Sequence, residues 1–176
     1  MNLTPLGIIV LSWLARNPDK EFYVREVTEA VHGSLGGCHK VLKSLYDKGL
    51  LTRRKSGRNI YYSVNDRNPA VKYFKIFMSI YELHDIIQAL QGKSVKIVLF
   101  GSCALGEDTI ESDIDIVVIT NEGNEVRRIL KSKSLSRDIA AVVLSPQDFV
   151  KLKEEDKAFY SEITKGIMLW DSYEGI

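Results

Sequence analysis

Two aspartates, Asp113 and Asp115, stand where an apolar run begins, and their spacing suggests chemistry. Residues two apart on a β-strand point to the same face, so these carboxylates are expected to converge. Neighbouring carboxylates repel each other unless a cation lies between them, and such oxygen ligands suit Mg²⁺ or Mn²⁺ completed by substrate phosphates. The pair therefore predicts a divalent-metal site for phosphoryl or nucleotidyl transfer.

A Gly-Ser pair precedes the aspartates. Gly101 and Ser102 directly follow the apolar segment 95–100, and ten residues separate Ser102 from Asp113. Glycine lets the backbone turn sharply and approach a ligand closely. A serine hydroxyl and the amides that follow a strand can contact phosphate oxygens. We therefore expect Gly101 and Ser102 to contact the phosphate groups of a substrate.

Residues 99–106 and 111–118 together resemble the nucleotidyltransferase superfamily related to DNA polymerase beta, particularly its minimal nucleotidyltransferases. The resemblance extends over about residues 93–176 and implies an α/β domain with a small mixed sheet. It implies that Asp113 and Asp115 hold one or two Mg²⁺ ions and that Gly101 and Ser102 contact the triphosphate of an NTP.

The chain departs from the family pattern at two positions. Active members carry a third carboxylate on a later strand, and the corresponding position here is Ala140. Asp138 lies two residues earlier and is the candidate to replace it. Leu105 stands where many members have arginine. Together these departures predict impaired transfer, with metal and nucleotide binding retained.

Residues 5–66 resemble the winged helix-turn-helix domain of prokaryotic regulators. Thr4-Pro5 begins a helix that Asn17-Pro18 ends, and helices are expected at 24–31 and 35–47. Two strand-like segments, 50–54 and 60–64, flank a glycine-bearing hairpin tip. The order of three helices and a hairpin carries the resemblance.

Basic residues concentrate on the third helix and the hairpin. In such a domain the third helix reads base edges and the wing neutralises phosphates. A dimerising or protein-binding role for the same surface stays open. The candidate DNA-binding residues are Ser34, His39, Lys40, Lys43, Arg53, Arg54, Lys55 and Arg58.

Charge also separates the chain into two parts. The net charge is +1 overall, but residues 1–66 carry +4 and residues 67–176 carry −3. The broad apolar stripe of 70–90 predicts one long connecting helix and suggests a homodimer through it. The chain shows no signal peptide and no run long enough to span a bilayer, so a cytoplasmic protein without membrane contact is expected.

The fold class expected is α+β. It comprises a winged helix-turn-helix at 1–66, a connecting helix at 67–92 and an α/β nucleotidyltransferase-like domain at 93–176. Further elements are expected as strands 95–100, 116–120, 138–145 and 166–171, and as helices 122–130, from Pro146, and 151–165.

Three functions remain open. The first is a DNA-binding regulator whose second domain binds metal and nucleotide. The second is an active enzyme that moves a nucleoside monophosphate from an NTP to a protein or small molecule. The third is an antitoxin-like protein that binds a protein partner.

Overall fold

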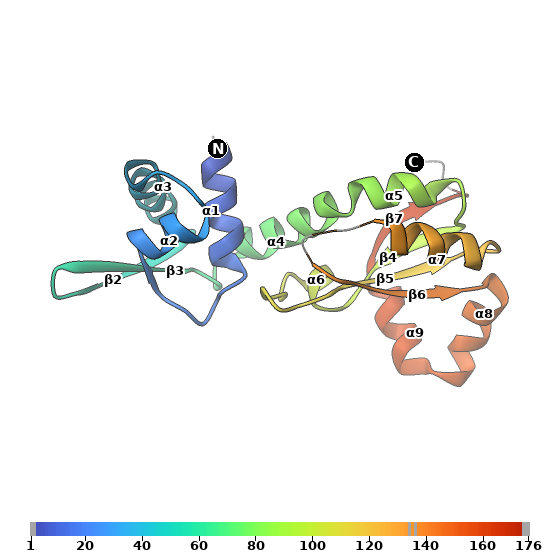
Figure 1. Ribbon diagram of the computed structural model, residues 1–176. Helices are drawn as coiled ribbons and strands as arrows, with labels where there is room; N and C mark the ends of the chain where they lie inside the picture. Colours follow the sequence, from blue (N-terminus) through green and yellow to red (C-terminus); the bar gives the residue numbers. More distant parts are fainter. Residues whose placement is uncertain (1–2, 134, 136, 174–176) are drawn as a thin grey trace. The chain divides into compact units, whose positions relative to one another are not determined.

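A computed structural model of the chain describes residues 3–133, 135 and 137–173. The chain divides into two compact units, Met1–Lys75 and Ile76–Ile176 (Figure 1). Among the described residues, no helix combines the length and apolar character that crossing a membrane requires.

The first unit has the helix and strand order of a winged helix-turn-helix domain, as the sequence predicts. Its sheet is antiparallel with the strand order β1-β3-β2, and β2 and β3 form the two-stranded wing that Figure 1 shows. The elements are α1 (Pro5–Ala15), β1 (Phe22–Tyr23), α2 (Val24–Ala30), α3 (Leu35–Asp47), β2 (Leu51–Ser56) and β3 (Asn59–Val64).

Helix α3 begins at a capped and tightly packed turn. The Ser34 hydroxyl accepts a hydrogen bond from the Gly37 amide at 3.2 Å. A Cβ atom at Gly37 would lie 2.7 Å from that hydroxyl and 3.0 Å from Leu6 Cδ2 of the first helix. Glycine at this position thus permits close packing of α3 on α1, and buried Leu42 and Leu45 complete the contact.

The segment predicted as one long helix over 70–90 contains two helices, so that prediction is wrong in detail. Helix α4 (Pro69–Glu82) ends before Leu83, and α5 (His84–Gln91) follows it. The Leu83 amide lies 3.2 Å from the Ile80 carbonyl oxygen and 3.3 Å from that of Ser79, which marks a locally tightened turn. The Leu83 side chain is completely buried and fixes this break in the core.

The second unit is a four-stranded mixed sheet with the order β6-β5-β4-β7. Strands β5 and β6 are parallel, whereas β4 pairs antiparallel with both β5 and β7. The elements are β4 (Lys96–Leu99), α6 (Gly101–Leu105), β5 (Ile114–Ile119), α7 (Gly123–Ser132), β6 (Ile139–Leu144), α8 (Pro146–Glu155), α9 (Lys157–Thr164) and β7 (Ile167–Asp171).

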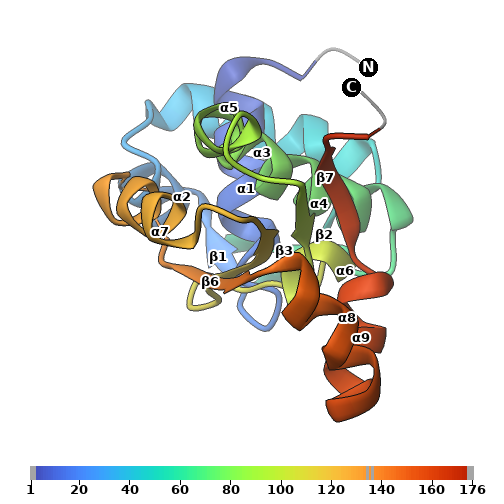
Figure 2. The same ribbon diagram turned by 90° about the vertical axis from the view of Figure 1, so that its right-hand side faces the viewer.

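Helices cover both faces of this sheet. Figures 1 and 2 show α5 and α7 on one face and α8 and α9 on the other. Alternating strand residues divide between two cores, because Ile114 and Ile116 pack on the α5/α7 side while Val117 and Ile119 pack with Ile163 of α9. A side chain in β5 or β6 can therefore be assigned to one face from its position alone.

Two further details differ from the sequence expectation. Helix α6 follows Phe100 directly, although no helix was expected there. The single helix expected at 151–165 is divided at Asp156, whose carboxylate accepts the Phe159 amide at 3.0 Å and caps α9. Helix α9 packs on the sheet through Phe159 and Ile163, and its Ser161 lines a cavity beside Gly101.

Candidate functional site

The turn from β4 into α6 brings Gly101 against Asp115. The Phe100 amide donates to the Asp115 carbonyl oxygen at 3.0 Å, which holds the end of β4 beside the start of β5. Gly101 has a φ of +64°, and a Cβ atom there would collide with the Asp115 carboxylate. The turn therefore requires glycine both for its backbone conformation and for the space beside the carboxylate.

Ser102 and Asp113 lie at the two ends of the segment that joins β4 to β5. Ser102 is half-buried in the first turn of α6, and its carbonyl oxygen accepts the Glu107 amide at 2.9 Å. Asp113 is exposed and directly precedes β5, and its carbonyl oxygen lies 3.5 Å from the donating Cys103 thiol. These contacts fix the segment that carries Asp113.

Negative charge accumulates around Asp115. Burial, followed by the charges of Asp113 and Glu162, raises the pKa of the Asp115 carboxyl group. Glu162 comes from α9, and nothing in the sequence singled it out among the charges of that segment. A bound divalent cation would relieve this repulsion, so the two aspartates fit a metal ion chemically.

The position at which the family pattern has a third carboxylate holds alanine in this chain. Ala140 of β6 pairs with Asp115 in the parallel ladder, where the family pattern has the third acid. Asp138 is exposed and lies one residue before β6, at the level of Asp113. Among the described residues, no three His, Cys, Asp or Glu side chains are close enough together to hold a metal ion. Of the three acid positions in the family pattern, this chain therefore fills the two at Asp113 and Asp115.

A cavity of about 220 Å³ opens beside Gly101 between α6 and α9. Leu105, which replaces the arginine of many relatives, lines it together with Lys165 at the end of α9. Ser161 and Glu162 also line the cavity, so a cation and two polar groups from α9 face the Gly-Ser turn. Sequence reasoning missed Lys165 because it lies sixty residues from Leu105.

The candidate DNA-binding side chains are all exposed on α3 and the wing. Arg54 is held by Glu21, with guanidinium-to-carboxylate distances of 2.6 and 2.9 Å, and Arg53 stacks over the Tyr46 ring at 4.2 Å. The Ser34 hydroxyl is engaged in the α3 cap. The remaining exposed candidates are His39, Lys40, Lys43, Lys55 and Arg58.

A buried ionic cluster, which the sequence did not suggest, lies behind the Asp113 segment. Arg137 is 6% exposed and donates to Asp108 at 2.9 Å and to Glu82 at 3.1 Å. It also contacts the Cys103 sulfur at 3.6 Å, and burial raises the pKa of that thiol. Arg137 thereby ties the start of β6 to the segment between α6 and Asp113.

These features define a winged helix-turn-helix unit and a mixed-sheet unit with a Gly-Ser turn facing paired aspartates. Residues 84–174 match the family model described as "Polymerase beta, Nucleotidyltransferase". The chain belongs to this nucleotidyltransferase family.

The chain is also similar to two solved structures. One is the homodimeric DNA-binding domain of Mb0332 from Mycobacterium bovis, a possible ArsR-family regulator, at 21% identity over 46% of this chain and 71% of that one, with a TM-score of 0.39. The other is a mutant of Lactococcus lactis ZitR in complex with DNA, at 20% identity over 52% and 62%, with a TM-score of 0.40. Among curated proteins, none matches this chain.

Proposed function

We propose that this protein is a DNA-binding regulator whose nucleotidyltransferase domain binds a metal–nucleotide complex and transfers poorly. The observation that carries the proposal is the paired register of Asp115 with Ala140. The metal-binding aspartates are present, whereas the position of the third carboxylate holds a methyl group.

In this proposal Asp113 and Asp115 hold Mg²⁺ or Mn²⁺. The ion would neutralise the phosphates of an NTP and polarise its phosphoryl oxygens. Gly101 and Ser102 supply the close backbone approach and a hydroxyl for the triphosphate. Lys165 lines the adjoining cavity beside Leu105 and supplies the positive charge that this position lacks.

The winged helix unit provides the DNA-binding half of the proposal. Lys40 and Lys43 lie three residues apart on exposed turns of α3, the helix that enters the major groove in this fold. Lys55 and Arg58 lie at the wing tip, where they can reach phosphates or the minor groove. Arg54 is paired with Glu21, which lies just before β1.

Calorimetric titration of each NTP with Mg²⁺ or Mn²⁺ tests the nucleotide half. We expect saturable binding that requires the metal and that the double variant Asp113→Asn/Asp115→Asn loses. Asp85→Asn, an exposed acid in α5 on the opposite face of the sheet, is the matched control and should bind normally. Equal binding by the double variant would refute the site.

Active transfer of a nucleoside monophosphate is the second candidate function. The presence of Glu162 near enough to affect Asp115 favours it, because an acid from α9 could assist the acceptor in place of the residue missing at 140. Asp138 is the alternative acid. Transfer of a labelled nucleoside monophosphate from an NTP tests this function. Loss of transfer in Glu162→Gln, with transfer intact in Asp138→Asn, would support it with Glu162 as the acid.

A further inference from the structure

Strand β6 is an edge strand of the sheet, so the backbone groups on one of its sides face away from β5. The Ile114 amide donates to the Asp138 carbonyl oxygen and the Thr120 amide to that of Leu144, both at 2.9 Å. Along a strand, the amide and carbonyl groups of successive residues point to opposite sides. The backbone groups of residues 138, 140, 142 and 144 therefore face β5. The amides and carbonyls of Ile139, Ala141 and Val143 therefore point away from the sheet.

This edge lacks the usual protection against strand pairing. The β6 sequence, Ile-Ala-Ala-Val-Val-Leu, contains no charged residue, proline or glycine. Natural edge strands commonly carry such residues to block pairing with another chain. Within the described part of the chain, the Arg127 guanidinium donates a hydrogen bond to one outward carbonyl oxygen, that of Val143, at 3.4 Å.

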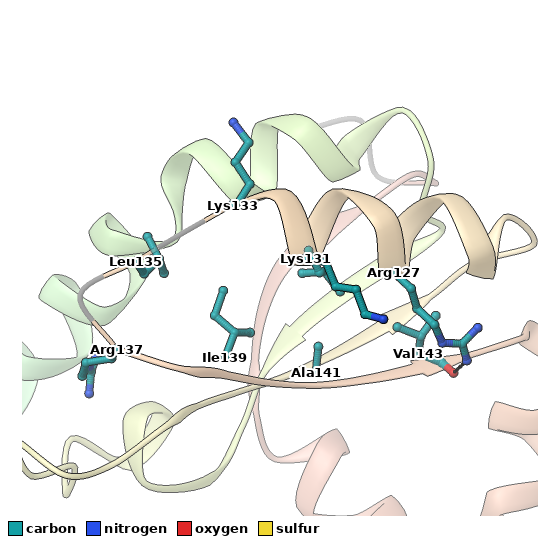
Figure 3. A pocket seen from close by; sticks show the side chains of 9 residues that line it. Arg127, Lys131, Lys133, Leu135, Arg137, Ile139, Ala141 and Val143 are labelled. Carbon is teal, nitrogen blue, oxygen red and sulfur yellow. Dashed lines mark hydrogen bonds between the residues drawn. The ribbon is translucent and has the colours of Figure 1, made fainter.

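A groove of about 460 Å³ runs along this edge (Figure 3). Its floor is apolar, with Ile139, Ala141 and Val143 rising from alternate positions of β6. Figure 3 shows Lys131 and Arg127 reaching down from α7 toward the strand. The groove is lined by Arg127, Leu130, Lys131, Lys133, Leu135, Arg137, Ile139, Ala141 and Val143.

The charge of the groove is positive. Arg127, Lys131 and Lys133 are exposed, and no acidic side chain lines the groove among the described residues. Arg137 is turned inward to Asp108 and Glu82. The groove thus combines outward backbone groups, an apolar floor and a cationic rim.

The groove is separate from the nucleotide site. Ile139, Ala141 and Val143 pack on the α5/α7 face of the sheet, whereas Asp115 faces the side of α9, like Val117 two residues later. A molecule seated in the groove would leave the Gly101 cavity open.

We propose that β6 is a docking site for an extended acidic segment of another protein, which adds a strand to the sheet. Its backbone would pair with Ile139, Ala141 and Val143, as in β-augmentation. Alternate apolar side chains would cover the floor and acidic ones would meet the rim. A second copy of this chain fits less well, because pairing two β6 edges would bring two cationic rims together.

A fluorescent synthetic peptide that alternates valine with glutamate tests the proposal by anisotropy. We expect binding to the intact protein, no binding of the valine–lysine counterpart, and about tenfold weaker binding to Lys131→Glu. Arg128→Glu, on the same helix but outside the groove, is the matched control and should bind normally. Failure of the valine–glutamate peptide to bind would overturn the proposal.

Amide hydrogen exchange distinguishes strand addition from simple charge attraction. Peptide should slow exchange at Ala141 and Val143, and Ala141→Pro should remove binding because it deletes an outward amide without deleting a bond to β5. If Ala141→Pro does not fold, the exchange data on the intact protein decide alone. If the peptide binds but amide exchange at Ala141 and Val143 does not slow, strand addition is overturned. If exchange at these amides slows with rising protein concentration in the absence of peptide, the edge pairs with a second copy of the chain instead.

Discussion

At the scale of single residues, the proposed nucleotide site takes its positive charge from α9 and not from α6. Leu105 occupies the family's arginine position, and Lys165 lines the same cavity from the end of α9. Positive charge in that cavity would offset the negative charge of triphosphate and of the three neighbouring acids. We therefore propose that Lys165 binds the nucleotide.

Lys165→Ala should weaken NTP binding by about tenfold in calorimetry. The double variant Leu105→Arg/Lys165→Ala should recover most of the loss, because both side chains reach one cavity. Lys153→Ala, on an exposed turn of α8, is the control. If Lys165→Ala binds as tightly as the unaltered protein while the aspartate variant does not, Lys165 has been wrongly assigned.

The wing offers a second test on single residues. Arg58→Ala should weaken duplex binding across all sequences and reduce the slope of log K against log salt by about 0.9, since one phosphate contact is lost. Lys72→Ala, an exposed cation on α4, should leave the slope unchanged. An identical slope for Arg58→Ala would remove the wing tip from the interface.

At the scale of elements, the buried cluster around Arg137 joins β6 to the segment before Asp113. Arg137→Met should lower the free energy of unfolding by about 3–5 kcal/mol, because Asp108 and Glu82 would lose their buried cationic partner. Arg128→Met, whose side chain is 79% exposed, should change it by less than about 0.5 kcal/mol. Chemical denaturation of both variants measures this, and equal effects would contradict the role of the cluster.

An ion pair between Lys96 and Asp171 joins β4 to β7. Lys96 Nζ lies 2.7 Å from Asp171 Oδ2, and this bond, with the Tyr173 amide, lowers the pKa of the Asp171 carboxyl group. A lowered pKa means that the stabilisation is complete above the unfolded-chain pKa of about 3.9 and is lost as pH falls through the folded value.

Asp171→Asn should therefore be less stable than the unaltered protein at neutral pH, and the difference should shrink as the pH falls below about 4. Unfolding by urea across this range measures it. A difference that does not change with pH would mean that the Lys96 pair does not contribute through its charge.

Sequence reasoning predicted most of these elements because their signals are local. Thr4-Pro5 marks the start of α1, and apolar runs mark β4 and β5. The break at Leu83 could not be predicted, since an apolar residue within a helical pattern carries no sign of a turn that tertiary packing imposes. Glu162, Lys165 and Arg137 were missed because only the fold brings them near the motif.

At the scale of the whole molecule, the chain joins a winged helix fold to a member of the nucleotidyltransferase family. The proposed regulator needs both halves, because nucleotide bound by one should alter DNA binding by the other. Such coupling is reciprocal and typically changes affinity by about 5- to 150-fold.

The most direct measurement is the affinity of the intact protein for a mixed-sequence DNA duplex, by anisotropy, with and without saturating Mg²⁺ and the NTP that binds in calorimetry. We predict a change of at least about fivefold that disappears in Asp113→Asn/Asp115→Asn and persists in Asp85→Asn. An unchanged affinity, with both ligands shown to bind, would contradict a nucleotide-responsive regulator.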